Sequence, residues 1–301
     1  MKKFIFSATL LVAGLGMSAQ LVEINSMQRV NLPEGMAVNI PTISPDGSFV
    51  VVSDMASSAL TKIDITSGAT AQVTDNGSGI GVKISTDGSQ VVFRQSTIAK
   101  NKLRYTSLQS VNLTDGKAKQ LVAPSRKLNG GVSITGNTVT AVENNKTRVL
   151  KLNGSKEAAT PVVSINYGHL EYTNASGKTT TLDPQGRGSY LWPALSPDGT
   201  KVVYYLAGGG CFVCNIDGSN PVSLGMLRAA TWLNNDVVVG MNDVDNGDFF
   251  VSSSIIAADL KGARQTLTED NIIAMYPTAS ADGKRIAFAT PDGQLFVINL
   301  K

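Results

Sequence analysis

The sequence predicts an all-β fold in which repeated antiparallel sheets close into a ring, and three observations support this prediction. A Ser-x-Asp-Gly motif recurs at residues 44–47, 85–88, 196–199 and 280–283, each time between an apolar run and a β-rich run. Degenerate copies at residues 133–136 and 232–236 occupy the same place in the pattern. The copies are spaced by about 47 residues on average, a length typical of four-stranded propeller blades.

The copy at residues 192–224 shows how one unit forms. Pro and Gly at the second and fourth positions of its Ser-Pro-Asp-Gly motif favour a turn, which leads into a second strand at residues 201–205. A third strand follows at 212–216, and Asp-Gly-Ser-Asn at 217–220 makes the next reversal. Such a unit cannot bury both of its faces alone. With markers near residues 46, 87, 135, 198, 236 and 282, we therefore predict a single six-bladed β-propeller domain over residues 20–301.

The two ends of the chain complement each other. Residues 21–32 resemble the fourth strands that end other units, such as 71–74 and 265–268. The last unit stops at residues 294–300, which is its third strand. We expect the N-terminal segment to complete this last blade, because closure removes free sheet edges.

Residues 131–191 are the least regular part of the pattern. Residues 167–182 match the third and fourth strands of a blade. That leaves 148–152 and 162–165, which we interpret as an extra hairpin joined near Asn153. The third blade is therefore expected to be elaborated.

The repeat resembles that of TolB-type six-bladed β-propellers, which are distant relatives of WD-type repeats. The resemblance covers nearly the whole chain after residue 19. In that family a propeller that follows an N-terminal α/β domain docks a peptidoglycan-associated lipoprotein. The first blade marker of this chain comes at Ser44, which leaves no room for that domain. The resemblance therefore implies an interaction scaffold rather than the whole TolB function.

Residues 1–19 are expected to be a secretory signal peptide. They combine Lys2 and Lys3 with an apolar stretch and with small residues at Ser18 and Ala19. No other stretch approaches the roughly 20 apolar residues of a transmembrane span, so we expect a periplasmic or secreted protein. Without those two lysines, 24 basic residues face 23 acidic ones, a balance that argues against nucleic-acid binding.

A binding site is expected at the rim of the channel that carries the longer loops. Insertions at residues 96–105, 146–166, 183–192 and 241–250 fall on this rim, and binding residues often lie on loops held by a rigid scaffold. Basic and aromatic residues there anchor protein partners or stack on sugars; the competing interpretation is that the aromatic ones pack between blades. The candidates are Lys100, Arg104, Tyr105, Arg187, Tyr190, Trp192 and Tyr276.

Catalysis is disfavoured by the scarcity of suitable side chains. His169 is the only histidine, and no Gly-x-Ser-x-Gly motif accompanies it. We expect it to make a local hydrogen bond within a strand. Cys211 and Cys214 lie in one expected strand, where residues three apart point to opposite faces, so we interpret them as two separate buried thiols rather than a redox pair.

The acidic loop at residues 242–248 admits two interpretations. Asp243, Asp245 and Asp248 could supply the oxygen ligands that Ca²⁺ prefers. The EF-hand spacing is not met, however, and a solvated turn accounts for the same residues. No other cofactor is expected.

The aspartates of the repeated turns are expected to cap their own turns through side-chain hydrogen bonds. They are Asp46, Asp87, Asp198 and Asp282.

The sequence thus favours an exported, monomeric, non-catalytic scaffold that binds an envelope or secreted protein. The alternative is a propeller that binds a glycan or small molecule at the channel mouth. That alternative includes a lyase or hydrolase using the carboxylates of Asp243, Asp245 or Glu143.

Overall fold

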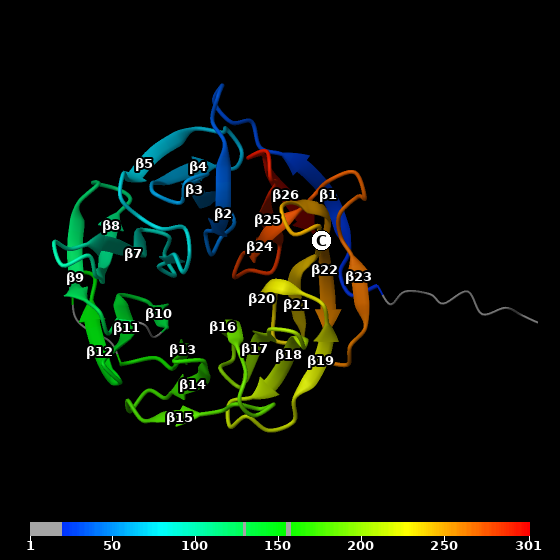
Figure 1. Cartoon of the computed structure of the whole chain (residues 1–301). Coiled ribbons are helices and arrows are strands. Elements are labelled where there is room, and N and C mark those ends of the chain that lie inside the picture. Colours follow the sequence, from blue (N-terminus) through cyan, green and yellow to red (C-terminus); the bar gives the residue numbers. More distant parts are fainter. Residues whose placement is uncertain (1–19, 129–130, 155–157) are drawn as a thin grey trace, which may run out of the picture.

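The computed structural model describes residues 20–128, 131–154 and 158–301, which form 26 strands in seven antiparallel sheets arranged as a ring (Figure 1). The described residues contain no helix that is long and apolar enough to cross a membrane. The expected signal peptide falls outside these residues.

Five blades have four strands each, numbered here from the channel outward. Blade one holds β2 (Val38–Ile43), β3 (Phe49–Asp54), β4 (Leu60–Asp64) and β5 (Thr70–Thr74). Blade two holds β6 (Lys83–Ile84), β7 (Gln90–Ile98), β8 (Arg104–Asn112) and β9 (Ala118–Ser125). Blade five holds β16 (Tyr190–Leu195), β17 (Lys201–Leu206), β18 (Gly210–Asn215) and β19 (Val222–Gly225). Blade six holds β20 (Arg228–Trp232), β21 (Val237–Asp245), β22 (Phe250–Asp259) and β23 (Arg264–Thr266). Blade seven holds β24 (Met275–Ala279), β25 (Arg285–Ala289), β26 (Leu295–Leu300) and β1 (Ile24–Arg29).

The two remaining blades have three strands each. Blade three holds β10 (Val132–Thr135), β11 (Thr138–Glu143) and β12 (Lys146–Lys151). Blade four holds β13 (Val162–Asn166), β14 (His169–Thr173) and β15 (Thr179–Thr181). The expected hairpin between residues 148–152 and 162–165 is therefore wrong, because those segments belong to different sheets.

The ring has seven blades, so the predicted count of six is wrong. Blade four is the one that the sequence pattern missed. Each sequence marker is the turn between the first and second strands of a blade. Leu182 N donates to Leu170 O at 2.8 Å, as Leu267 N does to Ile255 O between the fourth and third strands of blade six. Strands β14 and β15 are therefore a third and a fourth strand, and the described residues contain no first strand for blade four. A blade without a first strand has no marker turn to count.

Blade three has the complementary deficit, since the part of the chain that the structure describes supplies no fourth strand to it. Leu152 N donates to Asn137 O at 2.9 Å, and Ile65 N donates to Ser48 O in the same way at the end of the third strand of blade one. Strands β10 to β12 are thus a first, a second and a third strand. Strands β14 and β15 are the third and fourth strands that residues 167–182 predicted.

The predicted closure of the ring is confirmed. Strand β1 pairs with β26 in antiparallel register, with Met27 opposite Ile298 and Arg29 opposite Phe296. The end of the chain is held at the same seam, because Lys301 N donates to Glu23 O at 3.0 Å. The last blade is completed by a strand that comes from the other end of the sequence.

The core consists of apolar clusters between neighbouring blades. One cluster joins Val203 and Val213 of blade five to Val238 and Trp232 of blade six. A polar contact crosses the same interface, where Trp232 Nε1 donates to Ala194 O at 3.0 Å. Each blade is therefore stabilised by burying its faces against the next.

The repeated turns have the hydrogen bonds that the sequence predicted. Ser44 Oγ donates to Asp46 Oδ1 at 2.7 Å and accepts from Phe49 N at 3.1 Å. The hydrogen bond from Ser44 is the largest cause that lowers the pKa of Asp46. Gly47 completes the turn at φ 71°, a conformation that favours glycine. The same serine-to-aspartate bond recurs at Asp87, Asp198 and Asp282.

We predict that Ser44→Ala lowers the free energy of unfolding by about 1–3 kcal/mol, because it leaves the buried N–H of Phe49 without its acceptor. Urea denaturation measures this. The matched control is Ser48→Ala in the same turn, whose exposed hydroxyl also donates to Asp46 and whose loss costs within about 0.5 kcal/mol. Equal losses in the two variants would contradict the assigned role of Ser44.

Candidate functional site

A β-bulge marks the first strand of four blades at the mouth of the channel. The register shifts between Leu191 and Ala194 in β16, and the same shift occurs in β2, β20 and β24. A residue in the left-handed region lies within each bulge, and the four are Ile40, Trp192, Ala229 and Tyr276, with φ from 43° to 53°. Because the strained position recurs, it belongs to the blade architecture. The side chain placed there is what differs between blades.

In blade five the bulge presents an aromatic pair. Trp192 is 40% exposed, and its ring lies 5.5 Å from the ring of Tyr205 at an interplanar angle of 59°. Tyr205 is buried and stands opposite Leu191 in the next strand. The pair therefore offers a partly exposed indole on a buried support, which is the form of an anchor for a partner.

An ion pair lies beside these rings. Arg228 Nη1 is 2.7 Å from Asp243 Oδ2 and 3.5 Å from Asp245 Oδ2. The side chain of Asp243 is 1% exposed, whereas that of Arg228 is 30% exposed. A hydrogen bond with Tyr205 is the largest cause that raises the pKa of Arg228, and Asp243 adds to it. Arg228 thus links the aromatic pair of blade five to the acidic strand of blade six.

Tyr276 extends the group to blade seven. Burial raises the pKa of its phenol, the charge of Asp243 raises it further, and Arg228 opposes the change. Burial also raises the pKa of Asp243 by more than Arg228 lowers it. Trp192 packs on Tyr205, and Tyr205, Arg228, Asp243 and Tyr276 interact electrostatically. These five residues across three blades are here called the mouth cluster.

The structure separates the other predicted candidates from this cluster. Lys100, Arg104 and Tyr105 lie on the hairpin between β7 and β8, and blade two faces blades five and six across the ring (Figure 1). There Asn101 Nδ2 donates to the Tyr105 hydroxyl at 3.2 Å. Arg187 is exposed in the connection that leads to β16. The predicted residues therefore do not form a single patch.

Tyr190 is a core residue rather than a surface contact. It is 1% exposed, and its hydroxyl donates to Gly186 O at 2.7 Å while accepting from Gln185 N at 3.2 Å. Its ring also packs 5.5 Å from that of Tyr204. Of the two interpretations of the aromatic candidates, binding at the rim or packing inside the fold, packing applies to Tyr190.

The acidic loop is organised by a protein cation. Asp243 and Asp245 both face Arg228, while Asp248 is exposed on the β21–β22 turn. The residues that the structure describes contain no group of three or more His, Cys, Asp or Glu side chains placed to hold a metal ion. Arg228 supplies the positive charge that the calcium interpretation assigned to an ion.

Lys83 is a further charged group that the sequence reasoning missed. It lies on β6, the inner strand of blade two, two residues before Ser85 of the repeated turn. Thr42 and Thr278 occupy the equivalent positions in blades one and seven. Lys83 is exposed although its strand is innermost, so the axis of the ring is accessible to water. Although water reaches its side chain, the protein atoms that surround the channel partly desolvate the ammonium group and lower the pKa of Lys83, and the charge of Arg94 lowers it further. Blade two therefore presents a basic side chain toward the axis of the ring.

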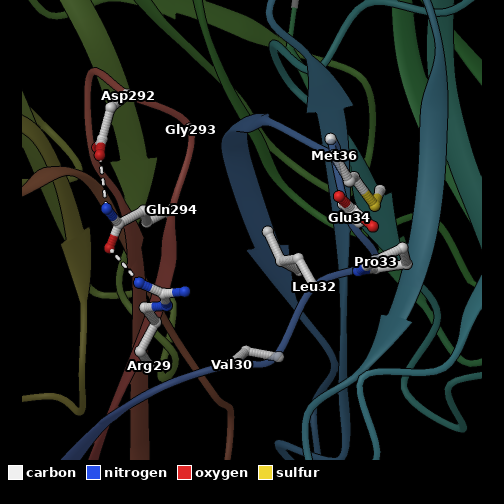
Figure 2. A pocket seen from close by; sticks show the side chains of 10 residues that line it. Arg29, Val30, Leu32, Pro33, Glu34, Met36, Asp292, Gly293 and Gln294 are labelled. Atoms are coloured by element: carbon white, nitrogen blue, oxygen red, sulfur yellow. Dashed lines mark hydrogen bonds between the residues drawn. The ribbon is translucent and has the colours of Figure 1, made fainter.

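A cavity of about 220 Å³ lies away from the mouth cluster, at the seam of the ring (Figure 2). The chain between β1 and β2 lines it together with the turn before β26. Arg29 Nη1 donates to Gln294 Oε1 at 3.3 Å, and Gln294 Nε2 donates to Asp292 Oδ2 at 2.5 Å. The bond from Arg29 to Gln294 crosses the seam, so the cavity lies between segments that ring closure brings together.

His169 and the two cysteines occupy the roles expected of them. His169 Nδ1 lies 2.5 Å from Asp183 Oδ2, which is a local hydrogen bond at the start of β14. Cys211 and Cys214 are free and buried, and burial raises the pKa of each thiol to about 12. Thiols held neutral in this way are inert.

Sequence reasoning missed Arg228 and Tyr205. Both lie in strands rather than in the long loops where binding residues were sought. Arg228 stands five residues before Leu233, which takes the place of the turn serine in blade six. Its position at the start of a first strand is the one signal that could have placed it at the mouth.

Comparison with known proteins bears on the fold alone. No family model matches the chain, and no curated protein matches it. Many solved chains do match. One comes from a crystal structure of a mitotic checkpoint complex, with a TM-score of 0.59 and 12% identity over 99% of this chain and 97% of that one. The chain is a β-propeller. At this identity the propeller fold is what the likeness shows.

We predict that Arg228→Met destabilises the propeller by about 2 kcal/mol at pH 7, because it leaves the buried carboxylate of Asp243 unpaired. Protonation of Asp243 removes that charge as pH falls through its raised pKa. The loss should therefore be smaller at pH 4, and urea denaturation at both pH values tests this. The double variant with Asp243→Leu is the control and should regain most of the stability. An equal loss at both pH values would count against the ion pair.

We also predict that Ca²⁺ at about 5 mM leaves the melting temperature of the propeller unchanged within about 1 °C, since a bound ion would raise it. Differential scanning fluorimetry measures this. A rise that disappears in the variant Asp245→Asn with Asp248→Asn would establish the calcium site instead.

Proposed function

We propose that the propeller is an exported, non-catalytic protein-interaction scaffold of the cell envelope that receives its partner on the mouth cluster. One observation carries this proposal: an exposed Trp192, supported by Tyr205, lies beside a partly exposed Arg228. Tryptophan, tyrosine and arginine are the residue types that dominate binding energy at protein interfaces.

The hairpin that joins β21 to β22 supports the same interpretation. Val244, Phe249 and Val251 on this hairpin are 56%, 74% and 52% exposed. Exposed apolar side chains that occur together on one hairpin favour a protein interface. The hairpin extends β21, which carries Asp243, so these apolar side chains lie on the same blade as Arg228 and Asp243 of the mouth cluster.

Two further arguments bear on partner and location. The similar solved chain comes from a complex of proteins, which agrees with a scaffold role. The expected signal peptide at residues 1–19 and the resemblance to TolB-type propellers support export and an envelope or secreted partner.

A second candidate function is binding of a glycan or small molecule at the same mouth. The partly exposed indole of Trp192 favours it, because aromatic faces stack on sugar rings. Carboxylate catalysis is less favoured. Asp243 faces Arg228, and Glu143 lies on blade three with its Oε2 3.4 Å from Arg148 Nη1.

Affinity capture of envelope proteins from the source cells tests the proposal. The bait is residues 20–301, compared with Trp192→Ala and with Arg104→Glu on the far side of the ring. We expect a captured protein whose binding falls at least about ten-fold with Trp192→Ala. The matched control is Lys284→Glu, an exposed residue in the turn that follows β24, which should leave capture unchanged.

Three outcomes decide between the candidates. Loss with Trp192→Ala alone establishes the mouth cluster as the interface. Loss with Arg104→Glu alone moves the interface to blade two. No capture by any bait, combined with a sugar that quenches the fluorescence of Trp192, would replace the scaffold by the glycan-binding function.

A further inference from the structure

Blade three ends in a strand whose outer edge has no partner strand. In the described residues β12 pairs with β11 on one side, and it is the last strand of its sheet (Figure 1). Every four-stranded blade covers the outer edge of its third strand with a fourth. Blade seven obtains that fourth strand from residues 24–29, far away in the sequence. A fourth strand in this propeller can therefore come from a distant segment.

The register shows which backbone groups of β12 point outward. Leu152 N donates to Asn137 O, and hydrogen-bonded positions alternate along an antiparallel pair. Leu150, Arg148 and Lys146 therefore bond to β11, while the N–H and C=O groups of Thr147 and Val149 point away from it. At the end of the strand, Lys119 Nζ donates to the outward Lys151 O at 2.8 Å.

The apolar core of blade three is open on the same side. Leu150 is only partly buried. In other blades the third strand ends in a backbone hydrogen bond equivalent to that of Leu152 N, and the residue two positions before the donor corresponds to Leu150. These counterparts are Ile63 at 0%, Val111 at 4%, Cys214 at 2% and Ile298 at 0% exposure. The difference is what a missing fourth strand produces, since that strand covers its neighbour.

The edge is also positively charged. Lys146, Arg148 and Lys151 are exposed along β12, and Lys119 reaches its end from blade two. Glu143 is the one acidic side chain among the described residues that forms an ion pair with this strand, at 3.4 Å from Arg148. An incoming strand would therefore be favoured if its flanks carried carboxylates.

We propose that β12 is a docking edge for an extended acidic segment of a partner protein, which adds to blade three as its fourth strand. The main-chain groups of Thr147 and Val149 hydrogen-bond the segment, an apolar residue of the segment covers Leu150, and the lysines bind its acidic flanks. This site lies on the outer edge of the ring and is independent of the mouth cluster.

The test uses the whole mature chain and the peptide acetyl-EETVTVTEE-amide, with acetyl-KKTVTVTKK-amide as its charge-reversed control. Amide hydrogen exchange is followed by NMR. The acidic peptide should slow exchange at Thr147 and Val149, and it should leave Arg148 and Leu150 unchanged because β11 already binds their amides. The variant Lys146→Glu with Lys151→Glu should bind the acidic peptide about ten-fold more weakly and the basic one more tightly.

Matched variants separate this site from the mouth. Lys261→Glu, at an exposed turn of blade six, should leave peptide binding unchanged, as should Trp192→Ala. The proposal is overturned if the acidic peptide at about 1 mM gives no protection, if both peptides bind equally, or if binding leaves Thr147 and Val149 unprotected. Loss of binding in Trp192→Ala would instead place the peptide on the mouth cluster.

Discussion

The pairing of β1 with β26 is the interaction on which the ring depends. Each blade buries its faces against two neighbours, so an open ring would leave two blades half-covered. At the closing seam Val30 and Val38 pack in one cluster with Leu295 and Val297. The segment just before β1 is held by blade six as well, because Gln265 Oε1 accepts from the backbone N–H groups at residues 21 and 22. One short strand therefore joins blades six, seven and one.

The closed ring explains why the mouth cluster is where it is. The first strands of six blades, β2, β6, β10, β16, β20 and β24, converge on the axis. In four of them a bulge changes the register near the channel mouth. The same bulge position carries an isoleucine at residue 40 and a tryptophan at residue 192. The architecture fixes the positions, and the side chains supply the chemistry. Arg228 then couples the blades, because its partners lie on strands of blades five and six.

Local chemistry was predictable from the sequence, whereas blade count and site were predictable only in part. The turn at Ser44 and the closing strand before Val30 depend on residues close in sequence or at the chain ends, and both predictions are confirmed. The longest interval between markers, from residue 135 to 198, concealed a whole blade because β13 is a second strand without a first. The contact between Arg228 and Asp243 depends on a bulge in the pairing of β20 with β21, which no residue pattern reveals.

The two incomplete blades are adjacent, and this arrangement has an energetic consequence. In residues 131–154 and 158–301, blade three has no outer strand and blade four has no inner one. Their junction therefore has the fewest described strands of any in the ring. Among the described residues, the buried side-chain oxygens without a hydrogen-bond partner are Thr147 Oγ1 on β12 and Ser164 Oγ on β13, both at this junction. Each unsatisfied group costs about 1–3 kcal/mol. Missing strands and unpaired polar groups lower the local free energy of opening. The junction between β12 and β13 is therefore the part of the ring where added hydrogen bonds would stabilise the protein most.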